Sequence, residues 1–88
     1  MWVVVYRQEG DLHNVFGAFR SLAEAEAFVS DDVQRTKQYY KQLLDKNVGS
    51  FAIYQTFNAG AKLVYHVTNV GRRVDTWDIV KLRKRRNV

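Results

Sequence analysis

The 88-residue chain contains no cysteine and no proline. Lack of cysteine excludes disulfides and thiolate metal sites, and a reducing compartment, the cytoplasm, is the expected location. The longest apolar run, Met1 to Tyr6, is too short to cross a membrane and lacks the basic start of a signal peptide. A glycine-rich phosphate loop and a spaced set of metal ligands are also missing. The sequence therefore predicts no membrane span, no cofactor and no metal.

The positive charge of the chain is concentrated towards one end. The length predicts a single domain over residues 1–88, and 47% hydrophobic with 26% charged residues is typical of a globular protein. The formal net charge is +5, but residues 1–61 carry six basic and seven acidic side chains, whereas residues 62–88 carry eight basic and two acidic ones. A neutral body with a basic end favours a localised anionic partner.

The stretch from Ser21 to Lys46 has the clearest periodic pattern. Apolar residues at steps of three and four share one face of a helix; they are Leu22, Ala25, Val29, Val33, Tyr40 and Leu43. Ser21 and Glu24 have the spacing of a capping box, which predicts the start of the helix. A break at Ser30 to Asp32 is the alternative, because each of these residues is a good N-cap. The unbroken phase of the stripe favours one continuous helix.

Runs of β-branched and aromatic residues flank this helix on both sides. Before it, Trp2 to Tyr6 and Asn14 to Arg20 are predicted to form an antiparallel pair, and Gly17 indicates a bulge or a close backbone approach. Three further strands are predicted after it, at Phe51 to Phe57, Leu63 to Val70 and Val74 to Leu82. The predicted fold is α+β, in the order ββαβββ, with one long helix packed on one face of a mostly antiparallel sheet.

The pairing of the last three strands follows from which side chains would share a face. A loop at Gly71 to Arg73 sets Val67 opposite Trp77, and matching Ile53 to Val67 keeps the same side apolar. The face predicted to receive the helix carries Phe51, Ile53, Phe57, Leu63, Tyr65, Val67, Trp77 and Ile79.

A polar row of Tyr54, His66 and Asp78 is predicted across these strands on the opposite, open face. A carboxylate beside a histidine raises the pKa of the ring, so general acid-base chemistry is one interpretation. We favour the other, in which polar residues on a wet sheet face pair without catalytic purpose. This face also keeps apolar residues such as Val64 and Val80. It is therefore a candidate surface for a partner protein or a homodimer, with scattered exposed apolar surface as the alternative.

Basic residues cluster in the C-terminal tail, residues 81–88. The predicted nucleic-acid-binding or anion-binding residues are Lys62, Lys81, Arg83, Lys84, Arg85 and Arg86, with Lys62 placed near the tail by antiparallel strand pairing. Arg72 and Arg73 form a second, smaller basic patch at the far end of the same hairpin. Such a cluster suits phosphate contact, and the alternative is a solvated tail.

These features predict a small non-enzymatic protein that binds a macromolecular partner through its open sheet face and its basic end. The partner is nucleic-acid backbone or another protein. An aromatic RNA-binding consensus and a helix-turn-helix are both missing, which indicates backbone contact rather than base readout. One alternative is a small inhibitor or adaptor of another protein, of the type that phages and mobile elements encode. The other is a small metal-independent nuclease that uses Tyr54, His66 and Asp78.

Overall fold

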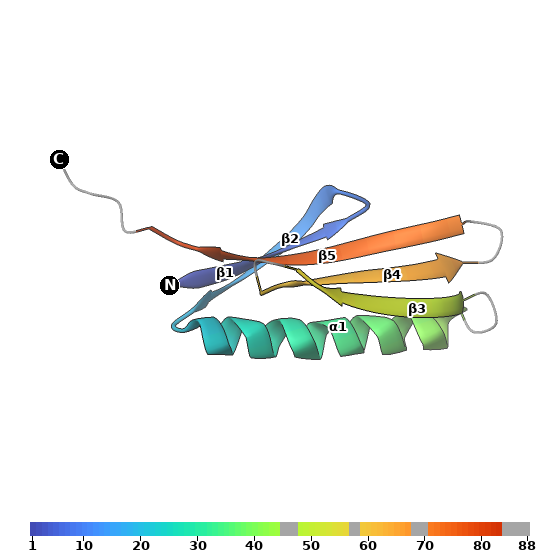
Figure 1. The fold of residues 1–88 in the computed structure, drawn as a ribbon, viewed down its shortest axis with the longest axis horizontal. Helices are drawn as coiled ribbons and strands as arrows, with labels where there is room; N and C mark the ends of the chain where they lie inside the picture. Colours follow the sequence, from blue (N-terminus) through green and yellow to red (C-terminus); the bar gives the residue numbers. More distant parts are fainter. Residues whose placement is uncertain (45–47, 57–58, 68–70, 84–88) are drawn as a thin grey trace.

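Residues 1–44, 48–56, 59–67 and 71–83 are described by the computed structural model. Their order is β1 (Trp2–Gln8), β2 (Asp11–Phe19), α1 (Leu22–Leu44), β3 (Val48–Gln55), β4 (Ala61–Val67) and β5 (Gly71–Lys81). The strands form one antiparallel sheet in the order β2-β1-β5-β4-β3, and α1 lies along one of its faces (Figure 1). The predicted α+β fold and the order ββαβββ are therefore confirmed.

Helix α1 begins at the predicted cap and runs without a break through Ser30 to Asp32. The Glu24 amide donates to Ser21 Oγ at 3.1 Å, and the Arg20 amide donates to Glu24 Oε2 at 3.0 Å. These two bonds satisfy amides at the helix start, which is the purpose of a capping box. No helix among the described residues has the combination of length and apolar character that a membrane span requires.

The core lies between α1 and the covered face of the sheet. Its buried hydrophobic members are Val4, Tyr6, Ala25, Val29, Val33, Ala61, Leu63, Tyr65, Trp77 and Ile79. The predicted contact of Trp77 and Ile79 with the helix stripe is confirmed, and the Trp77 Nε1–H donates to Asp32 Oδ2 at 2.9 Å. Leu22, also predicted on the stripe, is 37% exposed, because it stands at the first helical position. The side chains of Phe51, Phe57 and Val67 lie outside the described part.

The predicted register of the last three strands is wrong, although the faces are right. Trp77 pairs with Ala61 instead of Val67, and Ile53 pairs with Leu63 instead of Val67. These are slips of six and four residues, and an even slip keeps each side chain on the same face. The error comes from the loop: Gly71 to Arg73 belong to β5, which begins at Gly71 with φ at +100°.

Strand β2 forms one edge of the sheet and contains the predicted irregularity at Gly17. The pairing of β1 with β2 shifts register between Trp2 and Val3, whose partner is Gly17. A Cβ at Gly17 would lie 3.0 Å from the Trp2 carbonyl oxygen, and the residue has φ at +138°. Both the bulge and the close backbone approach are confirmed, and both require glycine here.

Candidate nucleic-acid interface on the open sheet face

The face of the sheet opposite α1 carries cations in register on neighbouring strands. Thr76 of β5 pairs with Arg7 of β1 on one side and with Lys62 of β4 on the other. Directly paired residues share a face, so Arg7 and Lys62 flank Thr76 across three adjacent strands. Strand spacing puts their backbones about 10 Å apart.

A second basic position lies further along the same face. Arg72 of β5 pairs with His66 of β4, and both side chains are exposed. Arg72 is four residues from Thr76, so this pair lies about 14 Å from the Arg7–Thr76–Lys62 row. Arg73, predicted in one patch with Arg72, pairs with Tyr65 and so has the orientation of the covered face, although it is exposed at the start of β5.

Asp78 is the one carboxylate among the described strand residues of this face. Its Oδ2 lies 2.9 Å from Arg7 Nη1, and both side chains are partly exposed. An ion pair at this exposure contributes little to stability, about 0.2–1 kcal/mol, because solvent screens it. Its main effect is to fix the direction of the Arg7 guanidinium. We call Arg7, Lys62, His66, Arg72, Thr76 and Asp78 the open-face polar set.

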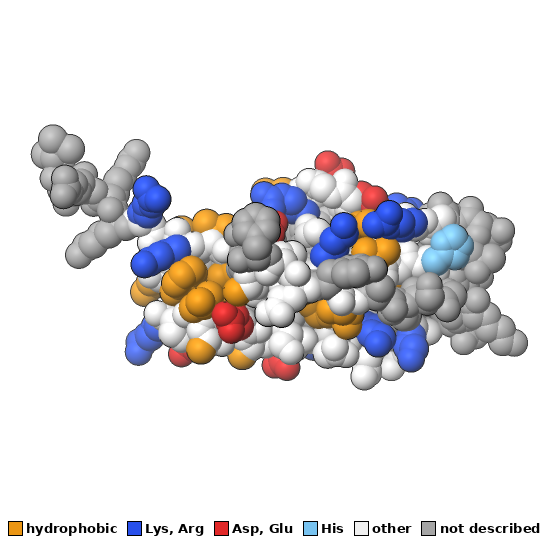
Figure 2. Space-filling view, viewed as in Figure 1, with side chains coloured by type: hydrophobic (Ala, Val, Ile, Leu, Met, Phe, Trp, Pro, Cys, Tyr) orange, Lys and Arg blue, Asp and Glu red, His pale blue; other side chains and the backbone are white. Residues whose placement is uncertain are grey.

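The described part of the basic tail lies at the end of β5. Lys81 and Arg83 are exposed, and Lys81 Nζ lies 5.6 Å from the centre of the Trp2 ring. The Leu82 amide donates to the Met1 carbonyl at 2.8 Å, which holds the beginning of the tail against the N-terminus. Figure 2 shows one group of Lys and Arg side chains over the strands and another where the chain leaves β5. Lys84, Arg85 and Arg86 lie outside the described residues.

The prediction that Lys62 lies near the basic tail is wrong. Lys62 pairs with Thr76, five residues before Lys81, which is about 17 Å along the strand. The six-residue slip of β4 carries Lys62 away from the tail and towards Arg7. Lys62 therefore belongs to the open-face polar set and not to the basic end.

The predicted row of Tyr54, His66 and Asp78 is also absent. Tyr54 pairs with Lys62, and His66 stands about 13 Å further along β4, opposite Arg72. Asp78 pairs with Val5 and binds Arg7. All three positions are on the open face, as predicted, but the register separates them. The arrangement that the nuclease hypothesis requires is therefore not formed.

Apolar side chains fill the spaces around the open-face polar set. Val3, Val5, Val64 and Val74 are partly buried on this face, and Val80 is exposed. No helix covers them among the described residues (Figure 1). The predicted amphipathic character of the open face is thus present.

The covered face contains a buried carboxylate that the sequence reading did not single out. Asp75 is 1% exposed, and its Oδ2 has no hydrogen-bond partner among the described residues. Desolvation raises the pKa of Asp75 to about 6, against the lowering effect of a hydrogen bond that the Tyr6 hydroxyl donates. Gln8 Nε2 in turn donates to Tyr6 Oη at 2.9 Å. The signal was present in the sequence, because the alternation that places Trp77 and Ile79 on this face places Asp75 there too.

Two tyrosines around Asp75 are held in their neutral form. Burial is the main cause that raises the pKa of Tyr6 and of Tyr65 above the ordinary tyrosine value. The Tyr65 ring stacks on the Tyr40 ring of α1, with the ring centres 4.7 Å apart. Tyr6, Tyr65 and Asp75 are buried, and the stacking of Tyr65 on Tyr40 packs the second half of α1 onto the sheet.

Comparison of the chain with protein-family models, with curated proteins and with solved structures gives no match. Among the described residues, His, Asp and Glu form no group of three or more that could hold a metal ion.

Proposed function

We propose that this protein is a non-enzymatic binding protein that contacts the phosphate backbone of nucleic acid with its open sheet face and its basic end. The observation that carries the proposal is the placement of Arg7, Lys62 and Arg72 on one face that no described helix covers. A cytoplasmic location is part of the same proposal.

The distribution of acidic side chains supports this choice of partner. Three of the five exposed acidic residues in the described part, Glu24, Glu26 and Asp31, lie on α1, on the other side of the sheet. Glu9 and Asp11 lie at the β1–β2 turn, where Glu9 Oε1 accepts a hydrogen bond from the Val74 amide. The open face has only Asp78 among its described strand residues, and Arg7 already neutralises it. With Glu9 at its border included, the open face has three cations, Arg7, Lys62 and Arg72, against two carboxylates, so a polyanion that approaches it meets a net positive charge.

The open arrangement of the face supports backbone contact without base readout. An open sheet presents no helix or ribbon of the width that enters a major groove. Lysine and arginine side chains spaced about 10–14 Å apart on such a face can reach the phosphates of a nucleic-acid backbone. We therefore expect weak dependence on base sequence and strong dependence on salt.

The test is fluorescence anisotropy with single-stranded and duplex oligonucleotides across a salt series. The matched pair is Lys62→Gln on the open face and Arg35→Gln on the exposed side of α1. We expect Lys62→Gln to weaken binding and to reduce the slope of log K against log salt by about one contact. Arg35→Gln should change neither.

Two results would overturn the proposal. One is the absence of binding to either oligonucleotide at low salt. The other is an equal loss of affinity in both variants, since this would mean that overall charge, and not the open face, determines binding. Absence of binding would favour the alternative, a small inhibitor or adaptor of another protein.

A further inference from the structure

Strand β3 forms an unprotected edge of the sheet. It pairs with β4 only, so the backbone amides and carbonyls of its other side have no strand partner among the described residues. Its eight residues, VGSFAIYQ, include no charged residue and no proline. Natural edge strands usually carry such residues, or bulges, to prevent pairing with another chain. At the opposite edge, β2 has two register shifts in its pairing with β1, whereas β3 has one, at its first residues.

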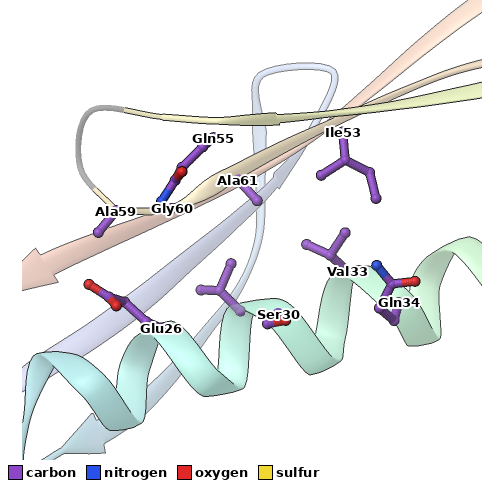
Figure 3. Close-up of a pocket in the computed structure, with 10 residues that line it drawn as sticks. Glu26, Ser30, Val33, Gln34, Ile53, Gln55, Ala59, Gly60 and Ala61 are labelled. Carbon is purple, nitrogen blue, oxygen red and sulfur yellow. The ribbon is translucent and has the colours of Figure 1, made fainter.

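An open hollow of about 210 Å³ lies between α1 and β3. Its inner wall is apolar, formed by Val29, Val33 and Ala61, and Ile53 of β3 borders it with 43% of its surface exposed. Figure 3 shows Ile53 and Val33 facing each other across the hollow, with Glu26 and Gln34 along the helix rim. Ile53 is thus a large exposed apolar side chain directly beside an unpaired strand edge, a position that pairing with another strand would cover.

The rim of α1 that faces this edge changes charge along its length. Glu26, Ser30 and Gln34 border the hollow, and Gln34 also borders the next hollow, together with Lys37 and Lys41. Steps of three and four place these five residues on one stripe of the helix. The stripe is acidic at Glu26 and basic at Lys41, and its midpoint falls at Val33 and Gln34, beside Ile53.

We propose that a second copy of this chain pairs with β3, antiparallel, about a two-fold axis beside Ile53. The two sheets then continue into one, and the two helices lie on the same side of it, running in opposite directions. The axis brings Glu26 of one helix towards Lys41 of the other helix, and it repeats this contact on the other side of the interface. The complementary charge of the stripe selects this copy over an unrelated strand, and a two-fold interface uses the same patch twice.

The proposal also accounts for the exposed surface of Ile53. Antiparallel pairing about this axis sets Ile53 against its symmetry mate, so each covers the other above the open end of the hollow. The two open faces become continuous across the axis. The dimer itself does not depend on the nucleic-acid proposal, because β3 and the α1 stripe contain none of the open-face polar set.

The first test is sedimentation velocity over a concentration series, without nucleic acid. The wild-type chain should form a dimer, and Ile53→Glu should weaken it by more than about tenfold, since it places two carboxylates at the axis in a desolvated contact. Circular dichroism checks that the variant is folded. A wild-type chain that is monomeric at every concentration up to the millimolar range would overturn the proposal.

The second test uses surface charges and leaves the core intact. Glu26→Lys and Lys41→Glu should each weaken the dimer by roughly two- to fivefold, and the double variant should recover the wild-type affinity. Asp31→Lys makes the same charge change one residue away from Ser30, about 100° round the helix, and should have no effect. Failure of the double variant to recover would exclude the antiparallel arrangement of the helices. Oligonucleotide binding by a monomeric Ile53→Glu variant would keep the proposed function separate from the dimer.

Discussion

The two faces of the sheet are built from alternate residues of the same strands, yet they carry different kinds of polar group. The covered face holds Asp75 at 1% exposure with one oxygen unpartnered, whereas the open face holds Asp78 in a solvent-exposed pair with Arg7. The two aspartates are three residues apart on β5. The difference shows that burial, not residue type, decides the effect of a carboxylate here. Ionisation of Asp75 lowers the stability of the fold, whereas Asp78 mainly changes the charge of the open face.

The largest expected contrast between the faces comes from truncating neighbouring residues of β4. Leu63 is fully buried against α1, and Leu63→Ala should lower the free energy of unfolding by about 3 kcal/mol. Val64 lies next in sequence on the open face and is partly buried, so Val64→Ala should cost about 1 kcal/mol or less. Urea denaturation at neutral pH measures both values.

Similar losses in the two variants would contradict the comparison, because they would mean that a partner or a second layer covers the open face in solution. Repeating the measurement in an Ile53→Glu background at several protein concentrations separates these cases, since any concentration dependence that remains without the β3 contact would come from a second copy on the open face.

The sequence predicts this division into faces well, and the reason is physical. Alternation has a period of two, so Trp77 and Ile79 fall on one face and Asp78 on the other in any register that slips by an even number of residues. The α1 stripe is equally robust, because Ala25, Val29 and Val33 repeat at helical spacing after a clear cap. Both features come from local pattern alone.

The candidate site was less predictable because it depends on register. Apolar residues occupy every second position of β4 from Ala61 onwards. Several registers of β4 against β5 therefore bury an apolar face almost equally well. The position of the turn decides among them, and Gly71 begins β5 instead of opening a three-residue loop. Because the observed register differs from the predicted one by six residues, Lys62 lies beside Arg7 and not near the tail, and His66 lies apart from Asp78. The charge distribution of the sequence held no information on this choice.

The second contrast concerns pH. The pKa of Asp75 is raised from 3.8 to about 6 by burial. Between these values the folded chain binds a proton that the unfolded chain has released. The free energy of unfolding should therefore fall as the pH rises from about 4 to 6, by about 2 kcal/mol from this group alone.

Asp75→Asn removes this dependence and should raise the stability at pH 7 relative to the wild type, with little difference near pH 4. Urea denaturation at pH 4, 5, 6 and 7 gives the comparison, with Asp31→Asn on the exposed side of α1 as the control for a general loss of charge. Parallel curves for wild type and Asp75→Asn would show that Asp75 is ionised in the folded state at low pH and is therefore better solvated than its burial indicates.

The smallest effect on stability, and the sharpest test of what the open face does, is expected from Asp78→Asn. Loss of the 2.9 Å pair with Arg7 should cost less than about 1 kcal/mol, because both side chains are partly exposed. The same change removes the one described strand carboxylate of the open face and leaves Arg7 uncompensated. Oligonucleotide affinity at low salt should therefore rise, by roughly two- to fivefold, and the gain should disappear at high salt. Asp31→Asn makes the same charge change on the far side of the sheet and leaves affinity nearly unchanged if contact is made at the open face. Equal gains in both variants would mean that the affinity depends on the net charge of the protein. The difference between the two faces of the sheet would then have no influence on binding.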